Sequence, residues 1–436
     1  MGVHGDYSTA YCICPKEGNK AINTCPGQIP TREITVVSSP LLIFCLFFVV
    51  GCGGNNDGAP PSNPVQTTPT LWDDIKSSAS PALLLGTEFN APTRLANVST
   101  LAWEDGLYIS DDGLHLFSFY APVSLFKFQE YVNTYPYVAP NVCAPISDYI
   151  RGPVLNGSDF ELQPPYDLPD SICNHGNGLV HSEIAHASRA SVNDDFSTWS
   201  RHALSTDFVY DGGFSSTDNG DGTYHLIYSQ STSADQNDIY WVQNATSLNP
   251  TSATPVPFPA PVNTNMQEDN PHLEKISASE LVLLFDNHYE TGGSGDTHIS
   301  YSVSIDNGTS WSVPAIITTG TINDFTEDLN GHLYRDGANN WWLYFTSNRD
   351  GKVEIWRIQH DSNNLVTDFD NWNTASMEKV IAVNGIAGDT GTMEGVGEPS
   401  LTANGDLYFV VVYCKNQSDQ TAFDGCDIDP WVATKK

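Results

Sequence analysis

The sequence predicts an all-β fold, a five-bladed β-propeller, and two observations lead to this prediction. First, one pattern occurs five times: an acidic residue opens a short strand, a turn containing Gly or Asn follows, and an apolar strand comes next. Second, the strands are rich in Tyr, Trp, Phe and Val and are separated by Gly, Asn and Asp, and no long amphipathic helix is evident. A supersecondary unit repeated at this spacing is typical of a propeller.

Each repeat is expected to hold four strands, which is the composition of one blade. The clearest copy begins at Glu268 and Asp269 and continues into the apolar run 281–286. A third strand is marked by an acid before Ile and aromatic residues, as in Asp238-Ile239-Tyr240, and a fourth carries Pro between short apolar steps. The five copies start at Glu104, Asp211, Glu268, Glu327 and Glu398.

The spacing of the copies leaves the blade number open between five and six. The first two acidic starts are about twice as far apart as the next two. A long insertion in the first blade, at 121–181, explains this with five blades, whereas a degenerate extra blade would give six. We expect the insertion, because its sequence is Pro-rich and irregular. A connection of this length is usually functional or disordered.

The last blade ends at Lys436 after its third strand, so its fourth strand has to come from elsewhere. Residues 88–97 match the fourth-strand pattern and lie just before the first acidic start. We therefore expect this segment to close the ring beside the C-terminal blade, which removes two free sheet edges at once.

The N-terminal part predicts export. Residues 41–50 form an apolar run that is too short to span a bilayer and is typical of a signal peptide. The run leads to Val49-Val50-Gly51-Cys52, which resembles the bacterial lipobox. The resemblance implies a signal region at 1–51, whose true translation start lies further along the chain, and a lipidated Cys52 at the outer membrane. A Gly-, Asn- and Pro-rich tether then leads, within 52–87, to the propeller at 88–436.

Four cysteines are expected to form two local disulfides in an exported protein. Cys143 and Cys173 lie in the insertion, and Cys414 and Cys426 flank a loop of the last blade. Each bridge would stabilise the fold by about 2–4 kcal/mol.

The charge excludes one class of partner. The chain has 52 acidic and 18 basic residues and a net charge of −34. Such a surface repels phosphate, so nucleic acid is not expected as a partner.

The repeats resemble the TolB-type, WD-repeat-like propeller family. The resemblance is carried by Glu398-Pro399-Ser400-Leu401, by Ser347-Asn348-Arg349-Asp350-Gly351 and by Asp238-Ile239-Tyr240. It implies a propeller with a binding or scaffolding role in the periplasm or at the cell surface. The segment 304–311 also resembles the Asp-box of sialidases, but the three-arginine cluster of such enzymes is not found.

The candidate site follows from the predicted topology. First strands line a propeller's channel, so the acidic strand starts should surround one mouth of it, with the insertion above. These residues are Glu104, Asp105, Asp211, Glu268, Asp269, Glu327, Asp328 and Glu398.

Three roles for this acidic ring remain open. The carboxylates could accept backbone N–H bonds and tie the blades together. They could bind calcium, at Glu268 and Glu327 in particular. They could also catalyse glycoside hydrolysis, with Glu394 or Glu398 as the acid and Asp105 or Asp211 as the base.

From the sequence we therefore expect a lipid-anchored propeller that binds a ligand or protein partner at an acidic channel mouth and is not an enzyme. The alternative is a carbohydrate-active glycoside hydrolase on the same scaffold. A hydrolase needs two carboxyl groups about 5–10 Å apart across an open pocket, whereas a scaffold does not.

Overall fold

The computed structural model describes residues 69–122, 137–138, 141–144, 151–156, 178–180, 182–206, 209–233, 236–264, 266–289, 296–324, 327–362, 364–383, 392–414 and 426–436. Cys52 and Cys173 lie outside these residues, so the lipid anchor and the first disulfide stay predictions. In the described part of the chain, no helix is long and apolar enough to cross a membrane.

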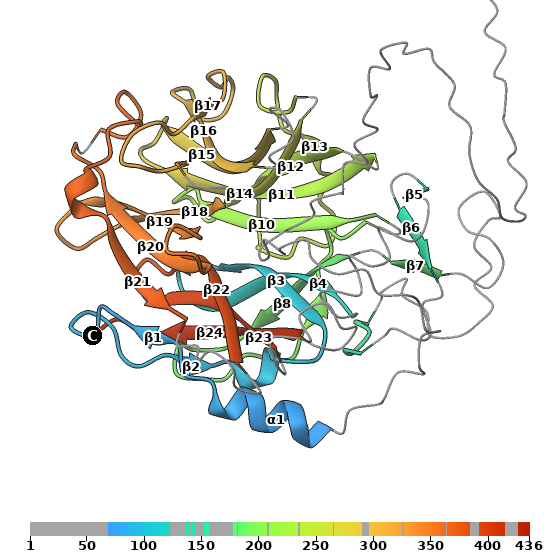
Figure 1. The fold of residues 1–436 in the computed structure, drawn as a ribbon. Helices are drawn as coiled ribbons and strands as arrows, with labels where there is room; N and C mark the ends of the chain where they lie inside the picture. The colour runs from blue at the N-terminus through green and yellow to red at the C-terminus, as the bar shows by residue number, and fades with distance from the viewer. Residues whose placement is uncertain are drawn as a thin grey trace, which may run out of the picture. The chain divides into compact units, whose positions relative to one another are not determined.

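The described strands form a five-bladed propeller, as predicted (Figure 1). Blade 1 consists of β3 (Trp103–Ile109), β4 (His115–Ala121), β8 (Glu183–Ser188) and β9 (Ser200–Arg201). Blade 2 consists of β10 (Asp211–Asp218), β11 (Tyr224–Ser233), β12 (Gln236–Ala245) and β13 (Val256–Pro257). Blade 3 consists of β14 (Gln267–Lys275), β15 (Leu281–Tyr289), β16 (Asp296–Ser304) and β17 (Ala315–Ile316).

The two remaining blades include strands from the N-terminal side of the chain. Blade 4 consists of β18 (Asp328–Arg335), β19 (Trp341–Ser347), β20 (Glu354–Gln359), β21 (Glu378–Ala382) and the added strand β1 (Ala82–Leu83). Blade 5 consists of β22 (Thr392–Leu401), β23 (Leu407–Cys414), β24 (Cys426–Ala433) and β2 (Thr93–Arg94). The alternative of six blades is therefore wrong.

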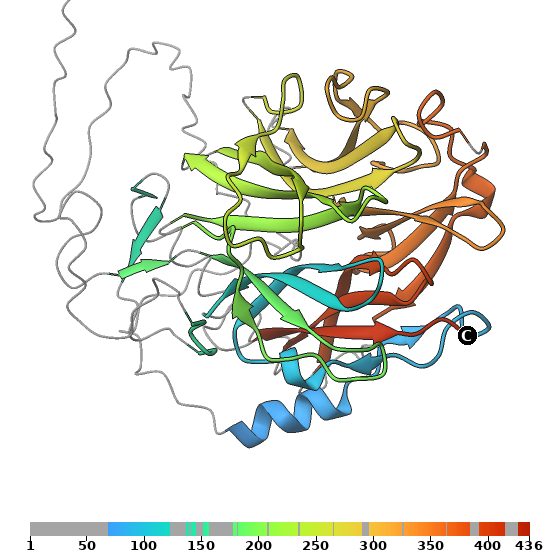
Figure 2. The same ribbon diagram turned by 180° about the vertical axis from the view of Figure 1, so that it is seen from behind.

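The ring closes as the sequence predicted. β2 pairs antiparallel with β24, with Thr93 opposite Val432. Phe89 forms a bridge with Lys435, and the Lys436 N–H donates to the Glu88 carbonyl at 2.9 Å. In both views the C-terminus lies beside the N-terminal strands, drawn in blue (Figures 1 and 2).

Two elements precede residue 88, at which the propeller was expected to begin. Helix α1 (Pro69–Ser78) buries Trp72 and Ile75 in an apolar cluster that includes Val411 and Trp431 of blade 5. β1 then pairs with β21 of blade 4. The N-terminal segment therefore joins blade 4 to blade 5 before β2 completes the ring.

The insertion 121–181 differs from the irregular loop that we expected. It contains a three-stranded antiparallel sheet of β5 (Tyr137–Val138), β6 (Asn141–Ala144) and β7 (Gly178–Val180). Cys143 lies in β6, but its side chain is outside the described residues.

The blades pack face to face, and this arrangement buries their middle strands on both faces. Residues 281–285 of β15 and all of β23 are buried for this reason. The predicted disulfide between Cys414 and Cys426 is confirmed. It joins directly opposite residues of β23 and β24, whose Cα atoms are 4.0 Å apart.

Candidate functional site

The innermost strand of every blade contains a β-bulge at the same level. At this level the register shifts at a pair of residues in each strand: Gly106-Leu107, Gly212-Gly213, Asn270-Pro271, Asn330-Gly331 and Glu398-Pro399. The strand of blade 5 has a further register shift between Met393 and Gly395. Four of the first bulge residues have left-handed backbone, with φ of 58° at Gly106, 46° at Asn270, 54° at Asn330 and 56° at Glu398. Bulges turn side chains and backbone groups toward new directions.

The bulges show that the five acidic residues expected at equivalent strand starts are not all at equivalent positions. The residue just before the bulge is Asp105, Asp211 and Asp269 in blades 1, 2 and 3, and Leu329 and Gly397 in blades 4 and 5. Glu398 is itself a bulge residue. The five acidic starts are therefore not equivalent positions, although three aspartates are.

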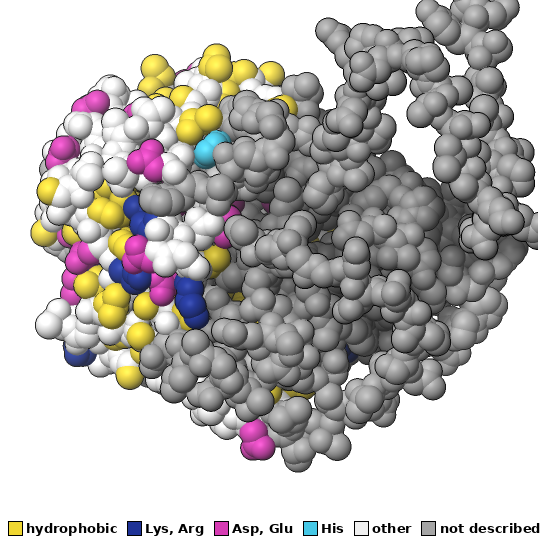
Figure 3. Space-filling model, viewed as in Figure 1, with side chains coloured by type: hydrophobic (Ala, Val, Ile, Leu, Met, Phe, Trp, Pro, Cys, Tyr) yellow, Lys and Arg dark blue, Asp and Glu magenta, His cyan; other side chains and the backbone are white. Residues whose placement is uncertain are grey.

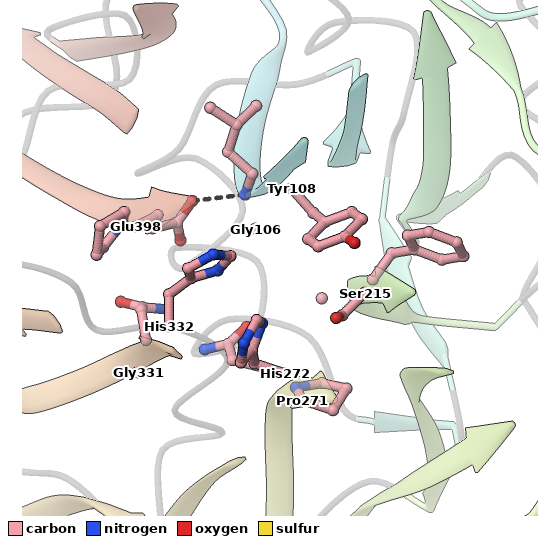
Figure 4. A pocket seen from close by; sticks show the side chains of 14 residues that line it. Gly106, Tyr108, Ser215, Pro271, His272, Gly331, His332 and Glu398 are labelled. Carbon is pink, nitrogen blue, oxygen red and sulfur yellow. Dashed lines mark hydrogen bonds between the residues drawn. The ribbon is translucent and has the colours of Figure 1, made fainter. Parts of the chain in front are cut away.

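The bulge residues of all five blades line a central cavity of about 40 Å³ (Figure 4). A water molecule occupies about 30 Å³ of liquid, so the cavity has room for water but not for a sugar ring. His272 and His332 lie beside each other in it, with ring centroids 4.0 Å apart.

The acids closest to the strand starts tie the incoming chain to the blade. Thr100 donates to Glu104 through its N–H at 3.0 Å and its Oγ1 at 2.5 Å. Thr264 makes the same two bonds to Glu268, at 3.3 and 2.5 Å. This repeated Thr-x-x-x-Glu spacing gives both glutamates a structural partner.

Among the expected ring residues, Glu268 and Glu327 differ from Asp328 in their surroundings. Burial raises the pKa of Glu268 to about 7. Burial also raises the pKa of Glu327 to about 7, against a hydrogen bond with Asn348. Asp328 forms an ion pair with Arg349 at 3.1 Å, a stabilising contact within blade 4.

Asp105 and Glu398 form a carboxyl pair where the first and last blades meet. Each carboxyl group affects the pKa of the other. Asp105 Oδ2 accepts from Trp103 Nε1 at 3.0 Å, and Glu398 Oε2 accepts from the Leu107 N–H at 3.0 Å. The other two oxygens have no further donor among the described residues. Two buried carboxyl groups close to each other do not both ionise readily, which favours a protonated form of the pair.

The environment of this pair favours its protonated form. Burial raises the pKa of Asp105. Burial, followed by the charge of Asp105, raises the pKa of Glu398 well above its ordinary range. The expected roles of Glu398 as an acid and Asp105 as a base stay predictions.

Asp211 is a second buried carboxyl group. Its Oδ2 accepts from the Thr206 N–H at 2.6 Å and its Oδ1 accepts from Gln230 Nε2 at 2.7 Å. Burial raises its pKa to about 8.

Asp269 receives the most hydrogen-bond donors of the three equivalent aspartates. Ser229 Oγ and the Asn270 N–H, at 2.8 Å, donate to Oδ1, and Asn237 Nδ2 donates to Oδ2 at 3.3 Å. Burial raises the pKa of Asp269, and these three donors oppose the rise. Donors to both oxygens favour the ionised form.

No group of three or more His, Cys, Asp or Glu within the described ranges is arranged to hold a metal ion. The calcium site at Glu268 and Glu327 therefore stays a prediction. Glu394 lies in β22, and its side chain is outside the described residues.

Basic side chains on the face shown in Figure 3 lie among acidic ones. Arg357 pairs with Glu88 at 2.5 Å and with Glu378 at 2.7 Å. Lys435 pairs with Glu88 at 2.8 Å. These cations are used within the fold and do not form a site for an anionic sugar.

No protein-family profile matches the chain, and no curated protein matches it in sequence. Several solved structures are similar. The catalytic domain of a GH62 α-L-arabinofuranosidase from Coprinopsis cinerea has a TM-score of 0.47 and 10% identity, over 78% of this chain and 95% of that chain. An α-L-arabinofuranosidase from Podospora anserina, in complex with cellotriose, has a TM-score of 0.41 and 9% identity, over 78% and 91%. A thermostable family-43 glycoside hydrolase has a TM-score of 0.44 and 7% identity, over 78% and 92%.

These comparisons correct three expectations. The chain resembles propellers of glycoside hydrolases, so the expected TolB-type, WD-repeat-like relationship is wrong. The main expectations of a binding or scaffolding protein, and of a chain that is not an enzyme, are wrong for the same reason. At identities of 7–10%, the likeness concerns the fold.

Sequence reasoning missed the residues that surround Asp269. Ser229, Gln230 and Asn237 come from the second and third strands of blade 2, whereas Asp269 belongs to blade 3. The polar residues at the adjoining ends of β11 and β12 indicated a site in the sequence. Only the packing of blade 2 against blade 3 brings them to Asp269.

Proposed function

We propose that the chain is a glycoside hydrolase that acts on a neutral carbohydrate. One observation carries the proposal: aspartates occupy the same position before the bulge in three consecutive blades, and the charge of one of them, Asp105, raises the pKa of Glu398. Glycoside hydrolysis needs one carboxyl group that gives a proton and one carboxylate that accepts one. The −34 net charge and the ion-paired cations favour an uncharged sugar.

The surroundings assign the two roles. The Asp105–Glu398 pair holds a proton and supplies it to the leaving oxygen, as a general acid must. Asp269, with three donors, is the carboxylate that accepts a proton. The charge of Asp105 raises the pKa of Asp269, so the two groups lie within electrostatic reach of each other.

Hydrolysis assays with the full chain test this proposal. The substrates are 4-nitrophenyl glycosides, including the α-L-arabinofuranoside and β-xyloside, together with arabinan, xylan and cello-oligosaccharides. We expect hydrolysis of at least one, and a loss of about a hundredfold or more in kcat for Asp269→Asn and Glu398→Gln. The matched control, Asp221→Asn, changes an exposed hairpin residue and should keep full activity. A wild-type chain that cleaves none of these substrates would refute the proposal.

A further inference from the structure

Three histidines lie together where blade 1 meets blade 2. His115 and His186 belong to the neighbouring strands β4 and β8, and His202 directly follows β9. His186 Nε2 lies 3.0 Å from His115 Nδ1, and the planes of the two rings differ by 14°. His186 is 9% exposed and His202 is 1% exposed. Residues 186, 202–204 and 248–249 are called the seam below.

Two backbone groups hold His202 in its neutral form. Its Nε2 lies 2.8 Å from the Leu248 carbonyl oxygen, which can only accept, so Nε2 carries the hydrogen. Its Nδ1 accepts the Leu204 N–H at 3.2 Å. A second proton on this ring would sit on Nδ1 and face that N–H. Because Leu248 follows β12, the bond to its carbonyl joins blade 1 to blade 2.

The neighbouring amide gives His186 the same arrangement. Asn249 Oδ1 accepts the Ala203 N–H at 3.0 Å, which turns its Nδ2 toward His186 Nδ1 at 3.5 Å. Nδ1 of His186 is therefore the accepting nitrogen, and Nε2 donates to His115 Nδ1. Each of the three Nδ1 atoms thus faces a donor. None of the rings can take up a proton without losing a hydrogen bond.

The rings are packed against apolar and aromatic side chains. His186 lies on Phe117 with ring centroids 4.9 Å apart, and His202 lies 5.2 Å from Phe214. Blade 2 adds apolar side chains and tyrosines to this cluster. Tyr108, which β3 adds, stays neutral because burial raises its pKa. A positive charge placed here has no water to stabilise it.

No carboxylate among the described residues offsets such a charge. Burial, followed by the charges of the other two histidines, lowers the pKa of His186 to about 3. Burial lowers the pKa of His202 to about 4, against its bond to Leu248. Arg201, on the adjoining β9, is paired with Glu183 at 2.9 Å. Histidine has a pKa of about 6.5 when unfolded, so the contribution of the neutral rings is present above that pH and is lost as the pH falls below it.

From this geometry we propose that the three histidines form an acid-sensitive switch, which opens the seam between blades 1 and 2 in mild acid. Protonation of His202 or His186 at Nδ1 removes the bond that Leu204 or Asn249 donates. Buried carboxyl groups such as Asp211 contribute more to stability as the pH falls, so the rest of the propeller stays folded while the seam opens. The switch uses no residue of the acidic ring and is independent of the proposed function.

Hydrogen–deuterium exchange of the full chain at pH 7.5 and 5.5 tests the switch, with rates corrected for the intrinsic pH dependence of exchange. Opening that frees one histidine is favoured about tenfold at one pH unit below its unfolded pKa. Peptides that cover the seam should therefore exchange at least about tenfold faster at pH 5.5. Peptides that cover β18 and β19 of blade 4 should not.

Neutral variants show whether the histidines cause this change. His186→Gln and His202→Gln keep a donor and an acceptor but cannot become charged, so the double variant should lose the acceleration. The measured quantity is the ratio of the rates at the two pH values, which a variant that is merely less stable does not alter in the same way. His225→Gln, which changes another buried histidine of blade 2, is the matched control and should keep the wild-type ratio.

The outcomes are decided without an activity assay. Equal corrected rates at the two pH values in the wild-type seam would overturn the switch. An acceleration that persists in the double variant would overturn it as well. The same holds for an acceleration shared equally by blade 4, since that reports opening of the whole propeller. The proposed function is tested separately by hydrolysis, so either can fail while the other stands.

Discussion

At the scale of single residues, several buried carboxyl groups accept hydrogen bonds from neutral donors. Asp211 is the clearest case, since its partners are a backbone N–H and the amide of Gln230. Removing an ionised carboxylate from water is costly, so such a group takes up a proton instead. The folded chain therefore binds protons that the unfolded chain releases.

This predicts that stability falls as the pH rises. The pKa of Asp211 is about 8 in the fold and about 3.9 when unfolded. Its contribution is thus fully present below about pH 4 and is lost as the pH rises through about 8. Asp211→Asn should keep this contribution at high pH, because Gln230 can rotate its amide to accept from Asn. Urea unfolding between pH 5 and 9 should show a smaller loss of unfolding free energy for this variant than for wild type.

The matched control for this measurement is Asp361→Asn, which changes an exposed aspartate of blade 4. It should follow the wild-type pH dependence. Parallel curves for wild type and Asp211→Asn would show that Asp211 is ionised in the fold at neutral pH.

At the scale of elements, the bulges determine how closely neighbouring blades approach. A Cβ atom on Gly212 would lie 2.2 Å from Ser229 Oγ and 3.1 Å from Asp269 Oδ1. The Asp286 carboxylate accepts the N–H of Asn330 at 3.0 and 3.1 Å and so ties blade 3 to blade 4. The bulges therefore join neighbouring blades, and the missing side chain at Gly212 leaves room for Ser229 and Asp269.

Gly212→Ala should disturb Asp269 without unfolding the chain. The added methyl group displaces Ser229, and overpacking of this kind costs about 1–3 kcal/mol. Thermal unfolding should show the lower stability. The kcat of hydrolysis should also fall, because Asp269 loses the hydrogen bond from Ser229. Gly337→Ala is the control, because its Cβ would meet nothing within 4 Å. Unchanged kcat in Gly212→Ala would contradict the role of this donor.

At the scale of the whole propeller, one cation holds the N-terminal helix to the last blade. Lys76 is 5% exposed and pairs with Asp427 at 2.6 Å and Asp429 at 2.7 Å. It also donates to the Thr100 carbonyl at 2.6 Å. The surrounding acids raise the pKa of Lys76, against the effect of burial, so it stays charged.

Lys76→Met should destabilise the chain by about 3–5 kcal/mol, because it removes the ion pair of buried Asp427 and leaves buried Asp429 with its longer contact to Arg94, at 3.4 Å. Chemical denaturation measures this loss. The double variant with Asp427→Asn should recover part of it, since one of the charges is then removed. A double variant no more stable than Lys76→Met would mean that the pair contributes little.

The blade number and the ring closure could be predicted from the sequence because turns and strand patterns are local. Gly113 and Gly405, for example, have φ of 71° and 90° in the expected turns. The bulges were missed, although Asn270 and Asn330 are residue types that tolerate left-handed backbone. Glu398 carries no such signal.

The role of Lys76 could not be predicted, because its partner Asp429 lies 353 positions later in the chain. The same holds for the donors around Asp269, which belong to another blade. Contacts between blades depend on packing that no local pattern records.

The pairing of β2 with β24 also determines the order in which the propeller can be completed during synthesis. The ribosome releases β2 before any other strand of blade 5, whereas its partner strand β24 follows all the other strands of the propeller. Blades 1 to 3 can form as their strands emerge, as domains do during translation. Blade 5 keeps an unpaired edge until β24 is free, so a nascent chain stalled before β24 exposes that edge to other chains.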